Sequence, residues 1–367
     1  MATLKSIKNK YLSASDGGVL GVTTNTENIA ALSFKIATAD SLSKFNLVDG
    51  MSDDYNDTSG VDAAASTDDT RDPSGFYSGK SGNDDITVFN ANGSFTVPAV
   101  VSAINVLVVA GGGGGGKYAG SGGGGGGAGG VVYQENRTVT PSASLSITIG
   151  AGGGGGNQGN GAVGQDSTFD TLTAKGGGGG GVHNGNNGNT GGTGGSGGGG
   201  GWQNGGGGAT NQASQPGDSG TYGFGNAGHS TTSPAGYGGG AGGGAGGGAT
   251  PGGPGYRGTA GASQPLPAWN VPLWMPAPDP YRPAINPIAG TDFGGGGGAG
   301  SYPTNRPTNM PTNAAQGGGG IGGPHTDGSG SAGVDGLGGG GGGGAGSNPG
   351  PAGCKGGAGI VVIRYPT

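Results

Sequence analysis

The chain has 367 residues, of which 104 are Gly and 22 are Pro, and the glycines stand in unbroken runs, which excludes the Gly-X-Y repeat of collagen. Hydrophobic residues make up 30% and aromatic residues 6%, too few for a conventional side-chain core along most of the length. The formal net charge of −6 lies in residues 1–100, with 13 Asp and Glu against 7 Lys and Arg, so the remainder lacks the clustered cations of a nucleic-acid-binding protein.

The first segment, residues 1–92, has ordinary sequence complexity. Its short apolar stretches, broken by Asn, Asp, Thr and Gly, predict a separate small β-rich domain. We expect no signal peptide, because the N-terminus has no apolar stretch of the required length, and no membrane insertion, because no run of 18 apolar residues follows. Residues 49–85 hold ten Asp and no Glu, which favours a solvated acidic loop but leaves a cation site open.

Residues 93–367 carry clear strand signals. Residues 103–110 (AINVLVVA) are β-branched and predict an opening strand, and residues 360–365 (IVVIRY) predict a closing strand of the same character. Residues 131–133 predict a second strand, and residues 144–149 alternate apolar and polar side chains as a half-buried strand does. A weaker strand signal covers residues 169–174.

About ten glycine runs separate and follow these strands, and two interpretations of them are open. Glycine tracts are often flexible linkers, because ordering glycine costs more backbone entropy than ordering any other residue. Alternatively, each run is an extended threefold helix of the polyproline II type, here polyglycine II, and only glycine lets such backbones approach closely enough to hydrogen-bond sideways. We favour an ordered bundle of polyglycine II helices, whose core is backbone.

Four segments carry a family likeness: NGSFTVPAVVSAINVLVVAGGGGGG at 92–116, GGGGGAGGVVYQ at 123–134, SLSITIGAGGGG at 144–155 and GGAGIVVIRYP at 356–366. Together they resemble the glycine-rich domain of bacteriophage tail fibre and appendage proteins, including fibre-tip adhesins. The resemblance implies a mainly β and irregular fold, in which a small β-structure of the opening and closing strands anchors the bundle. It also implies distal loops that bind a host receptor and an N-terminal part, residues 1–92, that attaches to other virion tail proteins.

A Pro- and Trp-rich insertion at residues 258–293 departs from that family pattern. Exposed aromatic side chains supply binding area at low entropic cost and sugar rings stack on them, although these aromatics could equally pack on the flank of the bundle. The aromatics and neighbours of the insertion and of three other glycine-rich loops are the candidate receptor-binding residues. They are Trp269, Leu273, Trp274, Met275, Tyr281, Arg282, Trp202, Tyr222, Phe224, Tyr237 and Tyr302.

Neither catalysis nor a cofactor is predicted. The three His residues lack metal-ligand spacing, no Ser/His/Asp set stands out, and the eight acidic residues beyond residue 100 form no recognisable pair for glycosidic cleavage. Cys354 is the single cysteine and excludes an intrachain disulfide.

We therefore expect a non-enzymatic protein of the virion tail, made in the host cytoplasm, whose tip binds a glycan or outer-membrane protein of a bacterium. A homotrimer is an expectation from fibres in general. The principal alternative is a structural tail or capsid spacer without a receptor site, and an ice-binding or matrix protein of the polyglycine type is a third.

Overall fold

The computed structural model describes residues 2–5, 10–14, 19–24, 34–35, 76–81, 84–183, 188–212, 223–231, 238–250, 258–266, 292–301, 317–323, 330–346 and 352–366. The chain divides into two compact units, and residues 86–366 belong to the second. Within the described ranges there are strands and extended segments but no helix.

The first unit contains a four-stranded antiparallel sheet in the order β1-β2-β3-β4. Its strands are β1 (Ala2–Lys5), β2 (Lys10–Ala14), β3 (Val19–Thr24) and β4 (Phe34–Lys35). Most of the acidic stretch 49–85 lies outside the described residues, so its role stays a prediction.

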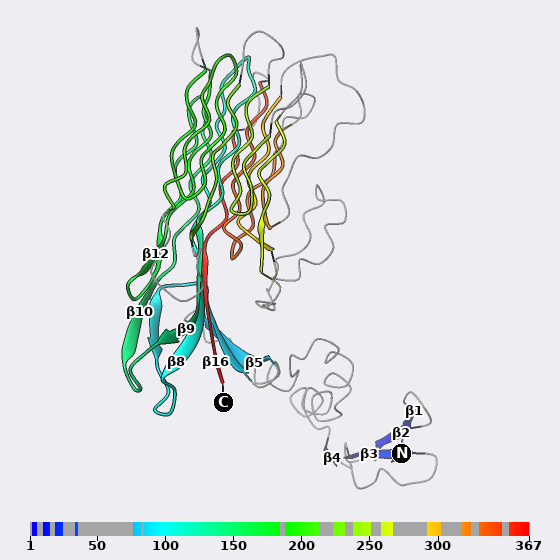
Figure 1. The fold of residues 1–367 in the computed structure, drawn as a ribbon. Helices are drawn as coiled ribbons and strands as arrows, with labels where there is room; N and C mark the ends of the chain where they lie inside the picture. The colour runs from blue at the N-terminus through cyan, green and yellow to red at the C-terminus, as the bar shows by residue number, and fades with distance from the viewer. Residues whose placement is uncertain are drawn as a thin grey trace. The chain divides into compact units, whose positions relative to one another are not determined.

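The strands of residues 86–366 lie in two sheets and a short strand pair (Figure 1). The larger has the order β13-β9-β8-β16-β6-β5, the smaller the order β12-β11-β10-β7, and a short pair, β14-β15, lies apart. The strands of the larger sheet are β5 (Phe76–Ser81), β6 (Asp84–Phe89), β8 (Ala103–Val109), β9 (Val131–Thr138), β13 (Gly223–Phe224) and β16 (Ile360–Pro366). The others are β7 (Gly93–Thr96), β10 (Ser144–Thr148), β11 (Ser167–Phe169), β12 (Leu172–Ala174), β14 (Gln264–Pro265) and β15 (Asp292–Phe293).

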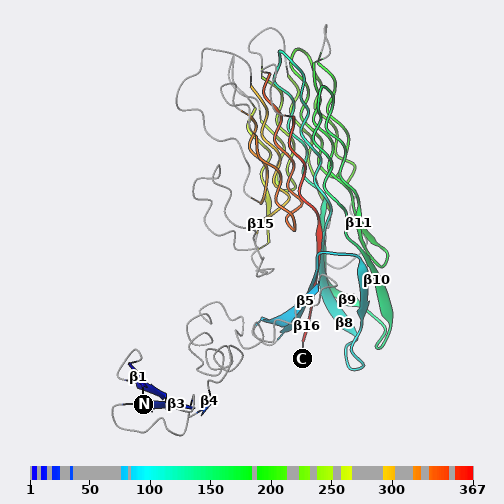
Figure 2. The ribbon, with the colours of Figure 1, turned by 180° about the vertical axis from the view of Figure 1, so that it is seen from behind.

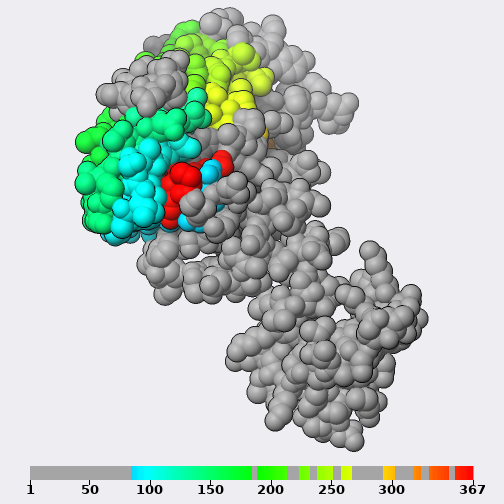
Figure 3. Space-filling model, turned by 60° about the horizontal axis from the view of Figure 1, so that its bottom comes forward, coloured from blue at the N-terminus to red at the C-terminus, as the bar shows by residue number. Residues whose placement is uncertain are grey.

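The opening and closing strands form the centre of the larger sheet. β8 and β16 pair antiparallel from Val109↔Ile360 to Asn105↔Arg364, although about 250 residues of chain separate them. Figure 3 views the sheet end of the molecule and shows the closing strand (red) directly beside the opening segments (cyan).

Both faces of these central strands are buried, which explains their continuous apolar sequences. Val106 and Val108 face one hydrophobic cluster, which lies between the two sheets and includes Phe169. Leu107 and Val109 alternate with them and face a second cluster, in which the sheet packs against Phe293 and other residues that adjoin the glycine runs.

Hydrogen bonds among the glycine runs follow a period of three residues, as polyglycine II requires. In the run 111–116, Gly111 donates its N–H to Gln165 and Gly114 donates to Ala162, three residues further back on the same neighbouring segment. The N–H groups of the intervening residues donate to two other segments, 354–357 and 124–127, with the same three-residue step. Successive residues therefore point to neighbours on three different sides.

The run 123–130 lies inside the bundle, because six segments surround it. Its N–H groups donate to 338–344, 175–181 and 240–243 at 2.7–3.0 Å, and its carbonyls accept from 110–116, 196–199 and 297–300. Each of these hydrogen bonds contributes a net stabilisation of about 0.5–1.5 kcal/mol. Backbone hydrogen bonds therefore stabilise the bundle where side chains are absent. Figures 1 and 2 show the segments running side by side away from the sheets.

Close packing explains why the runs need glycine. A Cβ built on Gly113 would fall far within 3.0 Å of the carbonyl oxygen of Gly178, and most bundle glycines meet a neighbouring backbone in the same way. Glycine is not required at every position on the outer surface, since a Cβ on Gly154 would meet no atom within 4 Å.

The predicted fold class, mainly β and irregular, is confirmed, and the runs form the expected ordered bundle. Strands are found at the expected 103–110, 144–149 and 360–365. The single strand expected at 169–174 is wrong: β11 and β12 form a hairpin there, with Asp170 in a left-handed backbone conformation (φ 50°) at the turn. β9 extends to Thr138, beyond the expected 131–133. Its second half is polar and exposed, with Arg137 held by Asp170 at 2.6 Å, so hydrophobicity gave no signal for it. Ile86 and Val88 of β6 already pack in the core of this unit, ahead of the expected boundary at residue 93.

Candidate functional site

The bundle has two ends with different side chains. Residues 111–116 continue directly from β8 and run away from the sheets, and segment 175–181 runs parallel to them because Gly177 and Gly180 donate to Gly111 and Gly114. The turns that follow such outgoing segments therefore lie at the far end (Figures 1 and 2). We call the described residues of these turns, 117–121, 156–160, 182–183, 188–190 and 201–205, the distal turns.

Trp202 is the tryptophan of the distal turns, which also contain Tyr118. The half-buried ring of Trp202 lies against the buried ring of His183, with centroids 4.5 Å apart and planes inclined by 50°. His183 Nε2 lies 3.0 Å from Gln203 Oε1, so the ring donates from Nε2 when the amide oxygen accepts. The left-handed backbone of Gln203 (φ 64°) and Asn204 (φ 62°) forms the tight turn that follows the tryptophan.

Amide side chains join the neighbouring distal turns. Asn160 Oδ1 accepts from the backbone N–H of Val182 at 3.1 Å and from Asn189 Nδ2 at 3.2 Å. Gln158 Oε1 accepts from the backbone N–H of Ala119 at 2.9 Å. These bonds tie separate turns into one continuous surface, because each crosses from one turn to another.

This surface is almost free of charge. Lys117 is the one charged residue in the distal turns as described, and it is only 2% exposed. His229 belongs to segment 223–231, outside the distal turns. Burial lowers its pKa below the ordinary value of 6.5, which favours the neutral ring at physiological pH. The remaining side chains of the distal turns are mostly amides, hydroxyls and aromatics.

The opposite end of the bundle, next to the sheets, holds two other candidate features. Phe224 lies in β13 at the edge of the larger sheet and stacks on Tyr133, with centroids 5.8 Å apart and planes inclined by 8°. β14 and β15 pair Gln264 with Phe293 and bring the two ends of the insertion together there. Phe293 and Leu266 are buried in the second hydrophobic cluster, against one face of the larger sheet.

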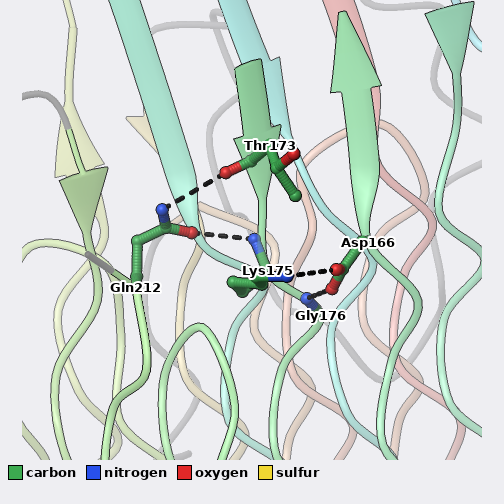
Figure 4. Close-up of polar contacts among 5 residues, drawn as sticks. All are labelled: Asp166, Thr173, Lys175, Gly176 and Gln212. Carbon is green, nitrogen blue, oxygen red and sulfur yellow. Dashed lines mark hydrogen bonds and ion pairs between the residues drawn. The ribbon is translucent and has the colours of Figure 1, made fainter. Parts of the chain in front are cut away.

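A polar network fixes the point at which β12 becomes a polyglycine segment (Figure 4). Gln212 Oε1 accepts from the backbone N–H of Lys175 at 2.8 Å, and Asp166 Oδ1 accepts from Gly176 at 2.8 Å. Asp166 Oδ2 also pairs with Lys175 Nζ at 2.8 Å. These side chains supply acceptors where no neighbouring segment does, in the way that a cap satisfies the end of a helix.

The structure thus separates two of the predicted site residues, because Trp202 lies at the distal end and Phe224 at the sheet end. The other predicted positions lie outside the described residues and stay predictions. They are Tyr222, Tyr237, Trp269, Leu273, Trp274, Met275, Tyr281, Arg282 and Tyr302. Sequence reasoning did not select Asn160, His183 or Gln203, whose only signal is a polar residue in a turn between glycine runs.

Neither a metal-binding cluster nor a membrane-spanning helix is found in the described ranges. No group of three or more His, Cys, Asp or Glu side chains is arranged to hold a metal ion there. Nor does that part of the chain contain a helix with the length and hydrophobicity needed to cross a membrane. Cys354 is partly buried and is not part of a disulfide.

Paired terminal strands and a lattice of polyglycine II helices define a class of glycine-rich bundle proteins. The family described as "Glycine-rich domain" matches residues 87–366, and the chain belongs to this family. The match begins in β6 and ends with β16, so it covers both sheets and the bundle. No curated protein matches the chain.

Proposed function

We propose that this chain is a non-enzymatic protein of a bacteriophage tail fibre or tail appendage, and that loops held by its bundle bind a receptor on the bacterial surface. Residues 1–92 would attach it to other virion proteins, and a homotrimer is one way to present several copies. Several weak contacts would then sum to a strong attachment.

One observation carries the proposal: the bundle excludes side chains from its interior and collects them at turns. A Cβ at most interior glycines collides with a neighbouring backbone, whereas the distal turns carry Trp202, His183 and a series of amides. A scaffold already held by backbone bonds loses little entropy when its loops bind, which favours affinity. The likeness of the segments at 92–116 and 356–366 to tail fibre proteins supplies the biological setting.

The alternative is a structural spacer of a tail or capsid, since a rigid bundle could serve only to set a distance. Adsorption is favoured because polar turns beside a half-buried tryptophan are unnecessary in a spacer. The two functions differ in one measurable property, which is saturable binding to cells.

Binding of the fluorescently labelled full chain to a panel of bacterial strains and their isolated envelopes tests the proposal. A variant in which a short Gly/Ser turn replaces residues 267–291 is available without strain, because β14 and β15 already bring the ends together. Trp202→Ala removes the tryptophan of the distal turns, and equal thermal unfolding of the variants verifies the fold.

Saturable binding to some strains, lost in at least one of the two variants, is the expected result. Loss in the loop replacement would place the receptor contact in the insertion, and loss in Trp202→Ala would place it at the distal turns. If the wild-type chain binds no strain in a broad panel, the receptor-binding proposal is overturned and the spacer remains.

A further inference from the structure

We infer that the distal turns form a subsite for a single neutral sugar ring, which stacks on Trp202 and hydrogen-bonds to the surrounding amides. The inference rests on the proposed function and names the chemical class of its receptor: a neutral glycan of the cell surface. Nothing in the family match specifies a ligand.

A fixed aromatic ring is the first requirement of such a subsite. The indole of Trp202 contacts the His183 ring at 4.5 Å between centroids, and the ring nitrogen of His183 is in turn held by Gln203 at 3.0 Å. Backbone bonds anchor both turns, since Gly201 donates to Asn189 at 2.9 Å. The tryptophan therefore has its orientation set before any ligand arrives, which limits the entropy lost on binding.

Hydrogen-bonding groups for sugar hydroxyls are the second requirement. Gln203 uses its carbonyl oxygen toward His183, and Asn160 uses its carbonyl oxygen toward Val182 and Asn189, so the NH₂ groups of both amides are left as donors beyond these bonds. Thr190, an exposed neighbour of Asn189, adds a hydroxyl that both donates and accepts. Mixed donors and acceptors of this kind match the vicinal hydroxyls of a pyranose.

Charge and size narrow the ligand class. Lys117 is buried, so the described distal turns present no charged side chain to bind a phosphate or carboxylate. A protein receptor needs about 800 Å² of contact on each partner, whereas glycines at positions 201 and 205 flank the Trp202 turn and Gly188 lies against the Trp202 backbone, so these three positions add no side-chain area. The Trp202 ring by itself fits the face of one sugar.

Fluorescence of a single tryptophan provides a direct test in the full chain. The chain has three tryptophans, so the double variant Trp269→Phe, Trp274→Phe leaves Trp202 as the sole emitter. The probes are methyl glycosides of glucose, galactose, mannose and N-acetylglucosamine, with glucuronic acid and sialic acid as anionic controls. The matched variant Trp202→Phe keeps the other two tryptophans, and an array of neutral and anionic bacterial glycans gives relative affinities.

The expected result is a saturable change in Trp202 emission with at least one neutral glycoside and none with the acids. On the array, Trp202→Ala should lose at least tenfold in affinity and Gln203→Ala should lose several-fold, while Trp202→Phe, which keeps a ring, should lose less than Trp202→Ala. Unchanged glycan binding by Trp202→Ala, or binding of acidic glycans alone, would overturn the inference.

Cell binding separates this inference from the proposed function. If the wild-type chain and Trp202→Ala bind cells equally and no neutral glycoside affects Trp202, the sugar subsite is wrong while receptor binding stands. If neutral glycans bind at Trp202 but no bacterial strain is bound, the subsite stands and the bacterial receptor is wrong.

Discussion

Replacing Gly113 by Ala tests whether backbone packing holds the molecule together. The added methyl group would overlap the carbonyl group of Gly178, so the segments 111–116 and 175–181 must separate. Two bonds join these segments, from Gly177 to Gly111 at 2.8 Å and from Gly180 to Gly114 at 2.9 Å. Leaving a buried polar group unsatisfied costs about 1–3 kcal/mol, so we expect a loss of about 2–6 kcal/mol in the free energy of unfolding.

Gly154→Ala is the matched control. Gly154 belongs to a run that contacts the same segment 111–116, yet a Cβ there meets nothing within 4 Å. The substitution reduces the entropy of the unfolded chain and should be neutral or stabilising by up to about 1 kcal/mol. Denaturant unfolding and differential scanning calorimetry of both variants provide the comparison. Equal stability of the two variants would refute the idea that interior glycines are fixed by close approach of neighbouring backbones.

Three further predictions concern side chains. Gln212→Ala removes the acceptor of the Lys175 N–H in a buried position and should lower the free energy of unfolding by about 1–3 kcal/mol in a denaturant titration, and wild-type stability would contradict the capping role. Asp166→Asn keeps an acceptor for the Gly176 N–H and removes only the partly exposed ion pair with Lys175. It should lower the free energy of unfolding by less than about 1 kcal/mol, and by less than Asp166→Ala does. The difference from wild type should shrink in high salt. Burial lowers the pKa of His229 in the folded state, so the unfolded chain binds more protons than the folded chain as the pH falls below 6.5. The contribution of His229 to stability should therefore be fully present above pH 6.5 and be lost as the pH drops further. His229→Gln should flatten the dependence of Tm on pH.

The sheets could be predicted from sequence because their residues are distinctive. β8 and β16 are buried on both faces, which demands uninterrupted β-branched side chains such as Val106, Val108 and Val362. The second half of β9 carried no such signal, because its residues are polar and Arg137 is held by hydrogen bonds to Asp170 and Thr171 in the turn between β11 and β12. Strands can be predicted from sequence where burial dictates the residue type, and they cannot where only hydrogen-bonded pairing defines the strand.

The distal turns could not be assembled from sequence, because identical glycine runs carry no information on which run neighbours which. Trp202 stood out as an aromatic, but its partner His183 is 19 positions away along the chain and is brought to it by lattice bonds. Phe224 stood out for the same reason as Trp202, yet it stacks on Tyr133 at the sheet edge. Aromatic residues in a glycine-rich loop therefore do not identify a common surface without the bundle.

The uniformity of the runs also explains how such a scaffold can carry varied loops. A glycine inserted within 111–116 would let the following glycines slide by one position, so every lattice bond is remade and only the turn at 117–121 grows. An insertion in β8 would instead exchange Leu107 and Val108 between the two cores, since consecutive strand residues face opposite sides. Lengthening a flexible loop costs little entropy, so the bundle transfers changes in length to its ends. A change in the length of a run would therefore alter the turns, while the backbone lattice that positions them is preserved.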